Sequence, residues 1–257
     1  MRAQTVSPAA GWRWLFTGFA IFRRNPPILS LLVVSYWATI ILLNVLPFIG
    51  AIAASMIAPG LSVGLMQAAR NIERGQAAGI QTLYGGLREN TRTLLALGAL
   101  YLVVTLGILG LSAIIDGGDL LRTLLASKPD ERAAAKDVDF ALPALFVLVM
   151  LTPVLMAWWF APVLAAWHRQ PLAKALFFSF VACWINWRAF LAYGAAVLLF
   201  GGIAPALLLG LLAALLPGLG ALISSLLIVF MALVMAPVIF ASFYASYRDI
   251  FGISEIV

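Results

Sequence analysis

Six long runs without a charged residue organise this chain. The first extends from Ile28 to Leu46. A helix of that length, at about 1.5 Å per residue, nearly crosses the hydrocarbon core of a bilayer, which is about 30 Å thick. The other five runs reach from about residue 50 to Ala69, from Leu94 to Ile115, from Phe140 to Trp167, from Ala189 to Leu216 and from Leu219 to Tyr247. The pattern therefore predicts six transmembrane helices.

Short breaks join these helices in pairs. Pro47 separates the first two runs, and Pro217 with Gly218 separates the last two, which predicts a tight reversal at both places. Residues 116–139 form the only sizeable hydrophilic loop in the sequence. We expect an all-α membrane bundle of three hairpins, with residues 1–257 as a single transmembrane domain.

The hydrophilic loop has two possible roles. A stretch that starts at Ser127 or Asp130 and ends in Lys136 carries acids early and a base late, which suits a short helix. The loop is either a solvated linker between two spans or a docking element for a periplasmic partner.

Aromatic and basic residues gather just before the odd-numbered spans. In the first such segment Trp12, Phe16 and Phe19 recur at helical spacing, and Arg13 and Arg24 fall on the other face. A helix of this kind lies in the headgroup plane of a membrane; alternatively, the aromatic rings pack as bundle core. The candidate membrane-interface residues are Trp12, Trp14, Arg23, Arg24, Asn25, Asn90, Arg92, Trp184, Asn186, Trp187 and Arg188.

Three stretches of the chain also resemble one another. Gly18 precedes Asn25 by seven residues, and Ser179 precedes Asn186 by the same interval. The similarity predicts an internal repeat in which a cytoplasmic amphipathic segment leads into an outward helix, a reversal and a returning helix. The suggested units are residues 11–70, 76–170 and 172–248.

Composition excludes a soluble globule. Hydrophobic residues make up 64% of the 257 positions and charged residues 10%, whereas a soluble domain carries about 25% charged residues. The formal charge of +6 would suggest nucleic acid as a partner of a soluble protein. Here the bases flank apolar runs, so we expect anionic lipid headgroups as partners and no nucleic acid.

The bases also predict an orientation. Twelve of the sixteen Lys and Arg residues lie on one side of the predicted bundle, and the other four lie in the 116–139 loop, where six acids outnumber them. Because loops rich in Lys and Arg stay in the cytoplasm, we expect both termini to be cytoplasmic and the acidic loop to be outside.

Reactive groups are scarce. The only histidine, His168, has no predicted His or carboxylate companion, so we expect no metal site. The only cysteine, Cys183, lies among apolar residues and is either an inert small side chain or a juxtamembrane palmitoylation site. No phosphate-binding GxxxxGK[ST] motif occurs, and no Asp, Glu, Lys, Arg or His lies within a predicted span. We therefore expect no catalytic residue, no cofactor and no enzyme activity.

Prolines and a glycine pair within the runs predict how the helices bend and pack. A proline frees a backbone carbonyl in its helix and favours a kink there. Gly60 and Gly64 form a GxxxG motif, which lets another helix approach closely, either within the chain or in a homo-oligomer. The prolines with this predicted role are Pro59, Pro153, Pro162 and Pro237.

Several motifs resemble an uncharacterised family of proteobacterial inner-membrane proteins. They are Gly11-Trp12-Arg13-Trp14-Leu15, Phe22-Arg23-Arg24-Asn25-Pro26 and Ala157-Trp158-Trp159-Phe160-Ala161-Pro162. More loosely, the hairpins look like those of YciC-type proteins and of the membrane region fused to some glycerophosphodiester phosphodiesterases. The resemblance implies a helical bundle in a bacterial inner membrane. It implies no reaction, because the chain has no phosphodiesterase domain.

Two hypotheses for the function follow. The first is a non-enzymatic membrane protein that organises lipid or protein partners through its basic and aromatic segments. The alternative is a channel or permease for a small neutral or lipophilic solute. That alternative needs a continuous polar cavity near residues such as Thr152 or Ser224.

Overall fold

The protein is built from helices throughout the part of the chain that the computed structural model describes, residues 3–125, 141–216 and 218–252. The predictions for Ser127, Asp130, Lys136 and Pro217 concern residues outside these ranges. The helices are α1 (Ala10–Arg24), α2 (Pro26–Asn44), α3 (Ile49–Glu73), α4 (Ile80–Gly85), the 3-10 turn η1 (Gly86–Arg88), α5 (Thr91–Asp116), α6 (Asp119–Leu125), α8 (Ala141–Trp159), α9 (Ala161–Trp167), α10 (Leu172–Ile185), α11 (Trp187–Val197), the π-helical η2 (Leu198–Ile203), α12 (Ala204–Leu215), α13 (Gly220–Phe230), the π-helical η3 (Met231–Met235) and α14 (Ala236–Phe251).

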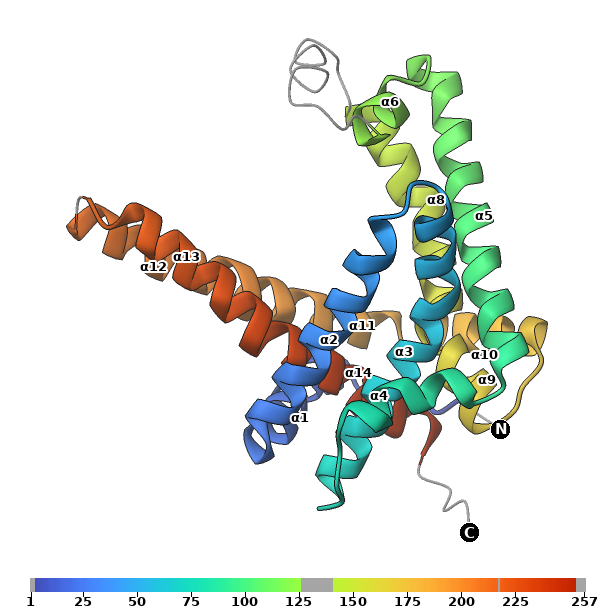
Figure 1. Ribbon diagram of the computed structural model, residues 1–257, viewed down its shortest axis with the longest axis horizontal. Helices are drawn as coiled ribbons and strands as arrows, with labels where there is room; N and C mark the ends of the chain where they lie inside the picture. The colour runs from blue at the N-terminus through green and yellow to red at the C-terminus, as the bar shows by residue number, and fades with distance from the viewer. Residues whose placement is uncertain (1–2, 126–140, 217, 253–257) are drawn as a thin grey trace.

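Six helical segments are long and apolar enough to cross a membrane, which confirms the predicted all-α bundle (Figure 1). They are α2, α3, α5, α8 with α9, α11 through α12, and α13 through α14. The ends of the second and sixth predicted spans differ in detail: α3 continues to Glu73 and α14 to Phe251. The last turns of these two helices therefore carry the charged residues Arg70, Glu73 and Arg248.

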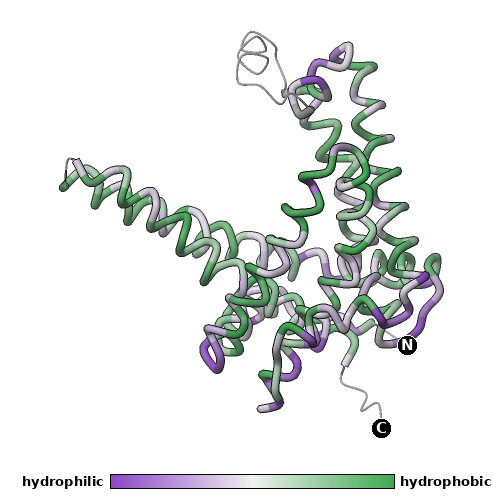
Figure 2. Tube along the Cα trace, viewed as in Figure 1, coloured by the Kyte–Doolittle hydropathy of each residue, from purple (hydrophilic) through white to green (hydrophobic). Residues whose placement is uncertain are grey.

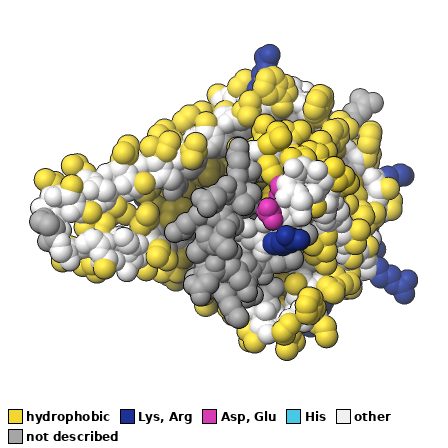
Figure 3. All heavy atoms as spheres, turned by 90° about the horizontal axis from the view of Figure 1, so that it is seen from above, with side chains coloured by type: hydrophobic (Ala, Val, Ile, Leu, Met, Phe, Trp, Pro, Cys, Tyr) yellow, Lys and Arg dark blue, Asp and Glu magenta, His cyan; other side chains and the backbone are white. Residues whose placement is uncertain are grey.

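The surface of the spans is apolar, as lipid contact requires. Helix α12 buries none of its residues, and α13 buries only Ile223. Together they project away from the other two hairpins (Figure 1), and hydrophobic side chains cover this projecting pair when it is seen from above (Figure 3). The two spans that contain them are 29 and 32 residues long. A hydrocarbon core of about 30 Å needs only about 20 residues, so these spans can cross it with a tilt.

Short helices precede the odd-numbered spans and pack against returning spans. Helix α1 packs on α14, the α4–η1 segment packs on α3, and α10 packs on α8 and α9. A side chain at Gly18 would meet the backbone of Val238 and Ser242, and one at Gly86 would meet the backbone of Gly60 and Gly64. In each pair, the two contacted residues stand one and five positions after a proline of the returning span: Val238 and Ser242 follow Pro237, and Gly60 and Gly64 follow Pro59. A repeated unit would make such matching contacts; the repeat itself stays a prediction.

The GxxxG motif of α3 is used within the chain. A Cβ atom at Gly64 would lie 2.0 Å from the carbonyl oxygen of Leu83, and one at Gly60 would lie 2.6 Å from the side chain of Leu87. Two glycines on one face thus let the backbone of α4–η1 lie directly against α3. Of the two alternatives for this motif, the structure shows the intramolecular contact.

The four prolines affect their helices differently. Pro59 and Pro153 lie inside α3 and α8, which continue past them. Pro162 stands at the start of α9, where the fourth span breaks at Phe160. Pro237 opens α14 directly after the π-helical η3. A π-helical turn absorbs the hydrogen bond that a proline cannot make, so the sixth span changes its pitch there.

Candidate functional site: a basic end and two apolar cavities

Hydrophilic residues gather at one end of the bundle, where α1, α4, α9, α10 and both termini lie, and at α6 on the opposite end (Figure 2). We call the first of these the basic end. The candidate membrane-interface residues lie at this end, because they belong to α1, to the start of α5 and to the segment from α10 to the start of α11.

Helix α1 divides its aromatic residues between the protein core and the outside. Phe16 and Phe19 are exposed, and Trp12 is half-buried. Trp14 is only 1% exposed, and its Nε1–H donates a hydrogen bond of 3.0 Å to the carboxylate of Asp249. This corrects the placement of Trp14 at the membrane surface: a buried indole needs a polar partner, and Asp249 supplies it.

A second group of exposed aromatic side chains lies between α10 and the start of α11. Phe177, Trp184 and Trp187 are all more than half exposed, while Ala182 and Cys183 on the other face of α10 are buried. The aromatic rings therefore project from the protein near the start of the fifth span. A Trp ring beside a span start suits the boundary between hydrocarbon and headgroups.

The arginines of the basic end lie next to these rings. The guanidinium of Arg23 lies 5.9 Å from the ring centre of Phe19, and that of Arg188 lies 5.4 Å from the ring of Trp187. Arg23, Arg92 and Arg188 are exposed and form no ion pair with any carboxylate that the structure describes. Arg24 differs, because it donates to the backbone carbonyl of Glu73. Three arginines are thus free to meet an outside anion.

The three asparagines that precede the odd-numbered spans hold the fold. Asn25 caps α2 by accepting a 3.4 Å hydrogen bond from the backbone of Ile28. Asn90 donates to the carbonyl of Ala165 at 2.9 Å, which joins the start of α5 to α9. Their amides thus bond within the protein.

Asn186 is the most deeply placed of the three, being only 2% exposed. Its side chain accepts from the backbone of Val6 at 2.8 Å and donates to the carbonyls of Gln4 and Ala182 at 3.0 and 2.9 Å. It therefore ties the N-terminal segment to α10. This corrects its assignment to the membrane interface, since a buried amide cannot contact headgroups.

A charged network that the sequence did not predict joins α3, α14 and α1. The carboxylate of Glu73 accepts from the hydroxyl of Tyr244 at 2.8 Å and forms an ion pair with Arg248. Arg248 also contacts the carboxylate of Asp249, the partner of Trp14. Removing one partner of such a partly buried ion pair would leave the other charge without compensation, so these residues join α3, α14 and α1 at the basic end.

A polar pocket opens between α3, α4–η1 and α9. Its volume is about 520 Å³, and Arg70, Arg169, Gln67 and Glu89 line it. Arg70 stacks on Trp167 with 5.1 Å between the guanidinium and the ring centre. Neither arginine pairs with a carboxylate in the described residues, so the pocket has a net positive wall.

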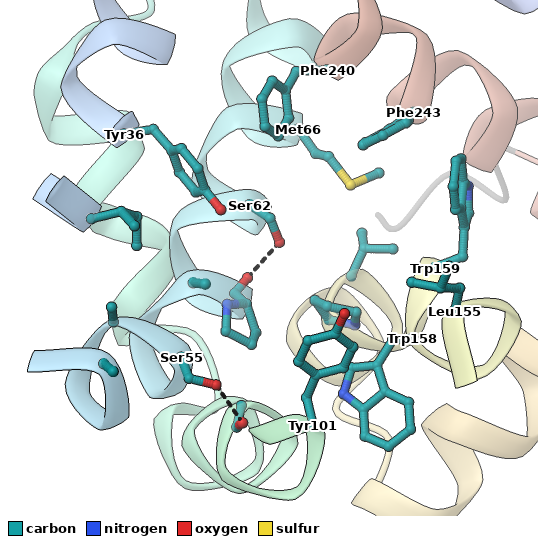
Figure 4. A pocket seen from close by; sticks show the side chains of 18 of the residues that line it. Tyr36, Ser55, Ser62, Met66, Tyr101, Leu155, Trp158, Trp159, Phe240 and Phe243 are labelled. Atoms are coloured by element: carbon teal, nitrogen blue, oxygen red, sulfur yellow. Dashed lines mark hydrogen bonds between the residues drawn. The ribbon is translucent and has the colours of Figure 1, made fainter. Parts of the chain in front are cut away.

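Two apolar cavities lie on the membrane side of the basic end. The first, of about 590 Å³, lies among α2, α3, α5, α8, α9 and α14 (Figure 4). The second, of about 600 Å³, lies among α8, α10, α11 and α14. Leu155, Trp159 and Phe243 line both, so one wall separates the two spaces. Cavities of this size fall in the range of small-molecule and cofactor sites, about 300–1,000 Å³.

One similar protein indicates the membrane to which the chain belongs. The chain is 37% identical over 262 residues to a Burkholderia thailandensis protein named "Probable inner membrane protein BTH_II0599", and the match covers 99% of this chain and 96% of that one. The chain belongs to this family of inner-membrane proteins. No family model matches the chain, and no solved structure does.

Family membership confirms the coarser part of the sequence-based resemblance: the chain is a multi-pass protein of a bacterial inner membrane. The looser likeness to YciC-type proteins and to phosphodiesterase membrane regions stays a prediction. The relative's name states no activity.

The two potentially reactive side chains of this family member are held in the fold. His168 shares a 2.5 Å hydrogen bond with the Tyr247 hydroxyl, and burial together with the nearby Arg70 lowers the pKa of the imidazole. Cys183 is buried, and burial raises the pKa of its thiol to about 12. Within the described ranges no three His, Cys, Asp or Glu side chains are placed to hold a metal ion.

Proposed function

We propose that this inner-membrane protein is non-enzymatic and binds anionic phospholipids at its basic end. The observation that carries the proposal is the set of exposed, unpaired arginines beside exposed aromatic rings, which includes Arg23 with Phe19 and Arg188 with Trp187. The aromatic rings suit the headgroup depth, and each arginine near an anionic surface contributes about 1 kcal/mol to binding. The polar pocket with Arg70 and Arg169 adds a recess for a phosphate group.

The proposal includes an orientation in which the basic end faces the cytoplasm. Twelve of the sixteen bases belong to that end by sequence, and an excess of Lys and Arg marks cytoplasmic segments. The anionic lipids of the cytoplasmic leaflet would then lie next to these arginines.

The absence of enzyme activity is likewise part of the proposal. Its support is the state of the two candidate nucleophiles: the His168 ring is hydrogen-bonded to Tyr247, and the Cys183 thiol is buried and protonated. A nucleophile or general base needs an accessible reactive form.

The proposal predicts that changing Arg23, Arg92 and Arg188 to Gln together weakens phosphatidylglycerol binding at least about tenfold. Arg24 stays unchanged because it bonds to the backbone at Glu73. Native mass spectrometry of the purified protein titrated with phosphatidylglycerol measures the effect, with phosphatidylethanolamine as the lipid comparison.

The matched control is Arg122→Gln, at the opposite end of the bundle on α6, where the arginine pairs with Asp119. This variant should bind phosphatidylglycerol as the unmodified protein does. Equal affinity of the triple variant and the unmodified protein would count against the proposed function.

A channel or permease is the second hypothesis. A pathway lined by polar side chains has little support. Thr152 lines the second cavity, but its hydroxyl donates to the carbonyl of Leu148 in its own helix. Ser224 donates to Gly220 within α13 and lines none of the three cavities described. The lipophilic form has the two apolar cavities in its favour, and solute flux into proteoliposomes tests it.

A further inference from the structure

Two of the six tyrosines have hydroxyls without a hydrogen-bond partner. The other four tyrosine hydroxyls bond within the protein, to the side chains of Thr39, Ser242, Glu73 and His168. Tyr36 and Tyr101 form no hydrogen bond with any residue that the structure describes. Both side chains are only partly buried, and their oxygens are accessible. These two hydroxyls are therefore open to a molecule from outside the protein.

Both hydroxyls point into the first apolar cavity. Figure 4 shows them there, with Tyr36 coming from α2 and Tyr101 from α5. Ser55 and Ser62 also line this cavity, but their hydroxyls already donate to backbone carbonyls. A phenol hydroxyl carries one hydrogen that it can donate. The tyrosines therefore supply two free donors to the cavity.

The two tyrosines stand at the same depth. Tyr36 is ten residues past the start of α2, and Tyr101 is ten residues past the start of α5. At about 1.5 Å per residue, each lies about 15 Å along a span that starts at the basic end, near the middle of a hydrocarbon core of about 30 Å. A polar group without a partner is costly at that depth. We therefore expect a partner that dissolves in lipid.

The second cavity has no free hydroxyl at the matching position. Both tyrosines stand eleven residues after the asparagine that precedes their span. Eleven residues after Asn186, the third such asparagine, stands Val197, and it lines the second cavity. The hydroxyls of Thr152 and Tyr193, which also line that cavity, already bond within the protein. Among the described residues that line the two cavities, free hydroxyls thus occur in the first alone.

The rest of the wall limits the chemistry of the partner. No Lys, Arg, His, Asp or Glu lines the first cavity, so a charged ligand would lack a counter-ion there. Aromatic rings line much of the wall and belong to Trp158, Trp159, Phe240 and Phe243 as well as to the two tyrosines (Figure 4). Such rings pack well against another flat ring.

We infer that the first cavity binds a lipid-soluble quinone and that Tyr36 and Tyr101 donate hydrogen bonds to its carbonyl oxygens. A quinone is uncharged, its ring is flat, and its two carbonyl oxygens are acceptors for the two phenol donors. Its alkyl chain suits the apolar surroundings. This site is distinct from the arginine surface of the proposed function, because its lining is uncharged and lies within the spans.

Tryptophan fluorescence of the detergent-solubilised full chain tests the inference, because Trp158 and Trp159 line the cavity. An alkylated benzoquinone should quench the fluorescence in two parts: a saturable part from bound quinone and a linear part from collisions. Changing Tyr36 and Tyr101 to Phe together keeps both rings but removes both donors. The dissociation constant of the saturable part should then rise about five- to a hundredfold, the effect of two net hydrogen bonds.

Tyr84→Phe is the matched control. Its hydroxyl bonds to Thr39, and Tyr84 lines neither apolar cavity, so this variant should bind the quinone as the unmodified protein does. The double variant should also unfold at the same temperature as the unmodified protein, because the two hydroxyls that it lacks have no partner in the fold. A lower unfolding temperature would show that they bond within the protein and would contradict the inference.

Two competitors separate the carbonyls from the ring. An alkylbenzene with the same chain lacks the carbonyls, and a monoacylglycerol with the same chain has an ester carbonyl but no flat ring. Both should displace the quinone poorly. Purely linear quenching, a saturable part that the double variant retains in full, or competition by either compound as strong as that of unlabelled quinone overturns the inference. None of these outcomes touches phosphatidylglycerol binding at the arginines, so the two proposals fail separately.

Discussion

Replacing Asn186 with leucine is expected to lower the free energy of unfolding by about 2–5 kcal/mol. The side chain makes three hydrogen bonds at 2.8–3.0 Å while only 2% exposed. Leucine has a similar volume but cannot accept from Val6 or donate to Gln4. Buried backbone groups left without partners cost about 1–3 kcal/mol each, and the N-terminal segment would lose its attachment to α10. The unfolding midpoint in detergent micelles measures the loss.

Asn25→Leu is the matched control for this substitution. Asn25 also precedes an odd-numbered span, but it is half-buried and makes one hydrogen bond of 3.4 Å. Its loss is expected to cost about 0.5–1 kcal/mol, near the lower limit for an N-cap. If both variants melt together, the hydrogen bonds of Asn186 do not have the importance assigned to them.

Gly64→Ala is expected to destabilise the protein by about 1–3 kcal/mol. The added Cβ atom would lie 2.0 Å from the carbonyl oxygen and 2.6 Å from the carbonyl carbon of Leu83. These are backbone atoms, so α4–η1 would have to move away from α3 as a unit. The movement would also reach Gly86, whose own close contact with Gly60 and Gly64 belongs to the same surface.

Gly110→Ala makes the same chemical change where space is open. Nothing lies within 4 Å of a Cβ atom at Gly110, which stands inside α5. Alanine favours a helix over glycine by about 1 kcal/mol, so this variant should be as stable as the unmodified protein or slightly more so. Thermal unfolding in one detergent compares the two variants. A Gly64→Ala midpoint as high as that of Gly110→Ala would show that the helices are not in backbone contact.

Chain-local signals predicted the six spans and their pairing. An uncharged run has to be satisfied in lipid by its own backbone hydrogen bonds, which leaves a helix as the available structure. The ends moved by only a few residues, as at α3, because polar residues such as Arg70 and Glu73 can extend a helix past the apolar run. The sequence also predicted that the glycines of α3 let another helix approach closely, but it did not identify α4–η1 as that neighbour.

Which face of each helix is buried was harder to predict. Trp14 and Trp12 are two residues apart in a segment with aromatic rings on several sides, yet one is buried and the other half-buried. The spacing of aromatic and basic residues marks α1 as amphipathic, but it does not tell a ring that meets the protein from one that meets lipid, because both surroundings are apolar. Which ring enters the core is then decided by its neighbours in space, here Phe190 and Tyr193 from α11.

The charged network and the cavities depend on contacts between distant residues. Glu73 and Arg248 are 175 positions apart, and nothing near either of them in the sequence identifies the other. The shared cavity wall combines α8 with α14 in the same way.

Thiol labelling tests most directly whether the basic end faces the cytoplasm. Single cysteines replace Arg23, Gln170 and Asp119 in a Cys183→Ala background, and a membrane-impermeant maleimide is added to spheroplasts and to inverted inner-membrane vesicles. Positions 23 and 170 belong to the basic end, and position 119 to α6 at the other end. We predict labelling of position 119 only in spheroplasts and of positions 23 and 170 only in inverted vesicles. The reverse pattern would place the arginines on the periplasmic side of the inner membrane and contradict the proposed orientation.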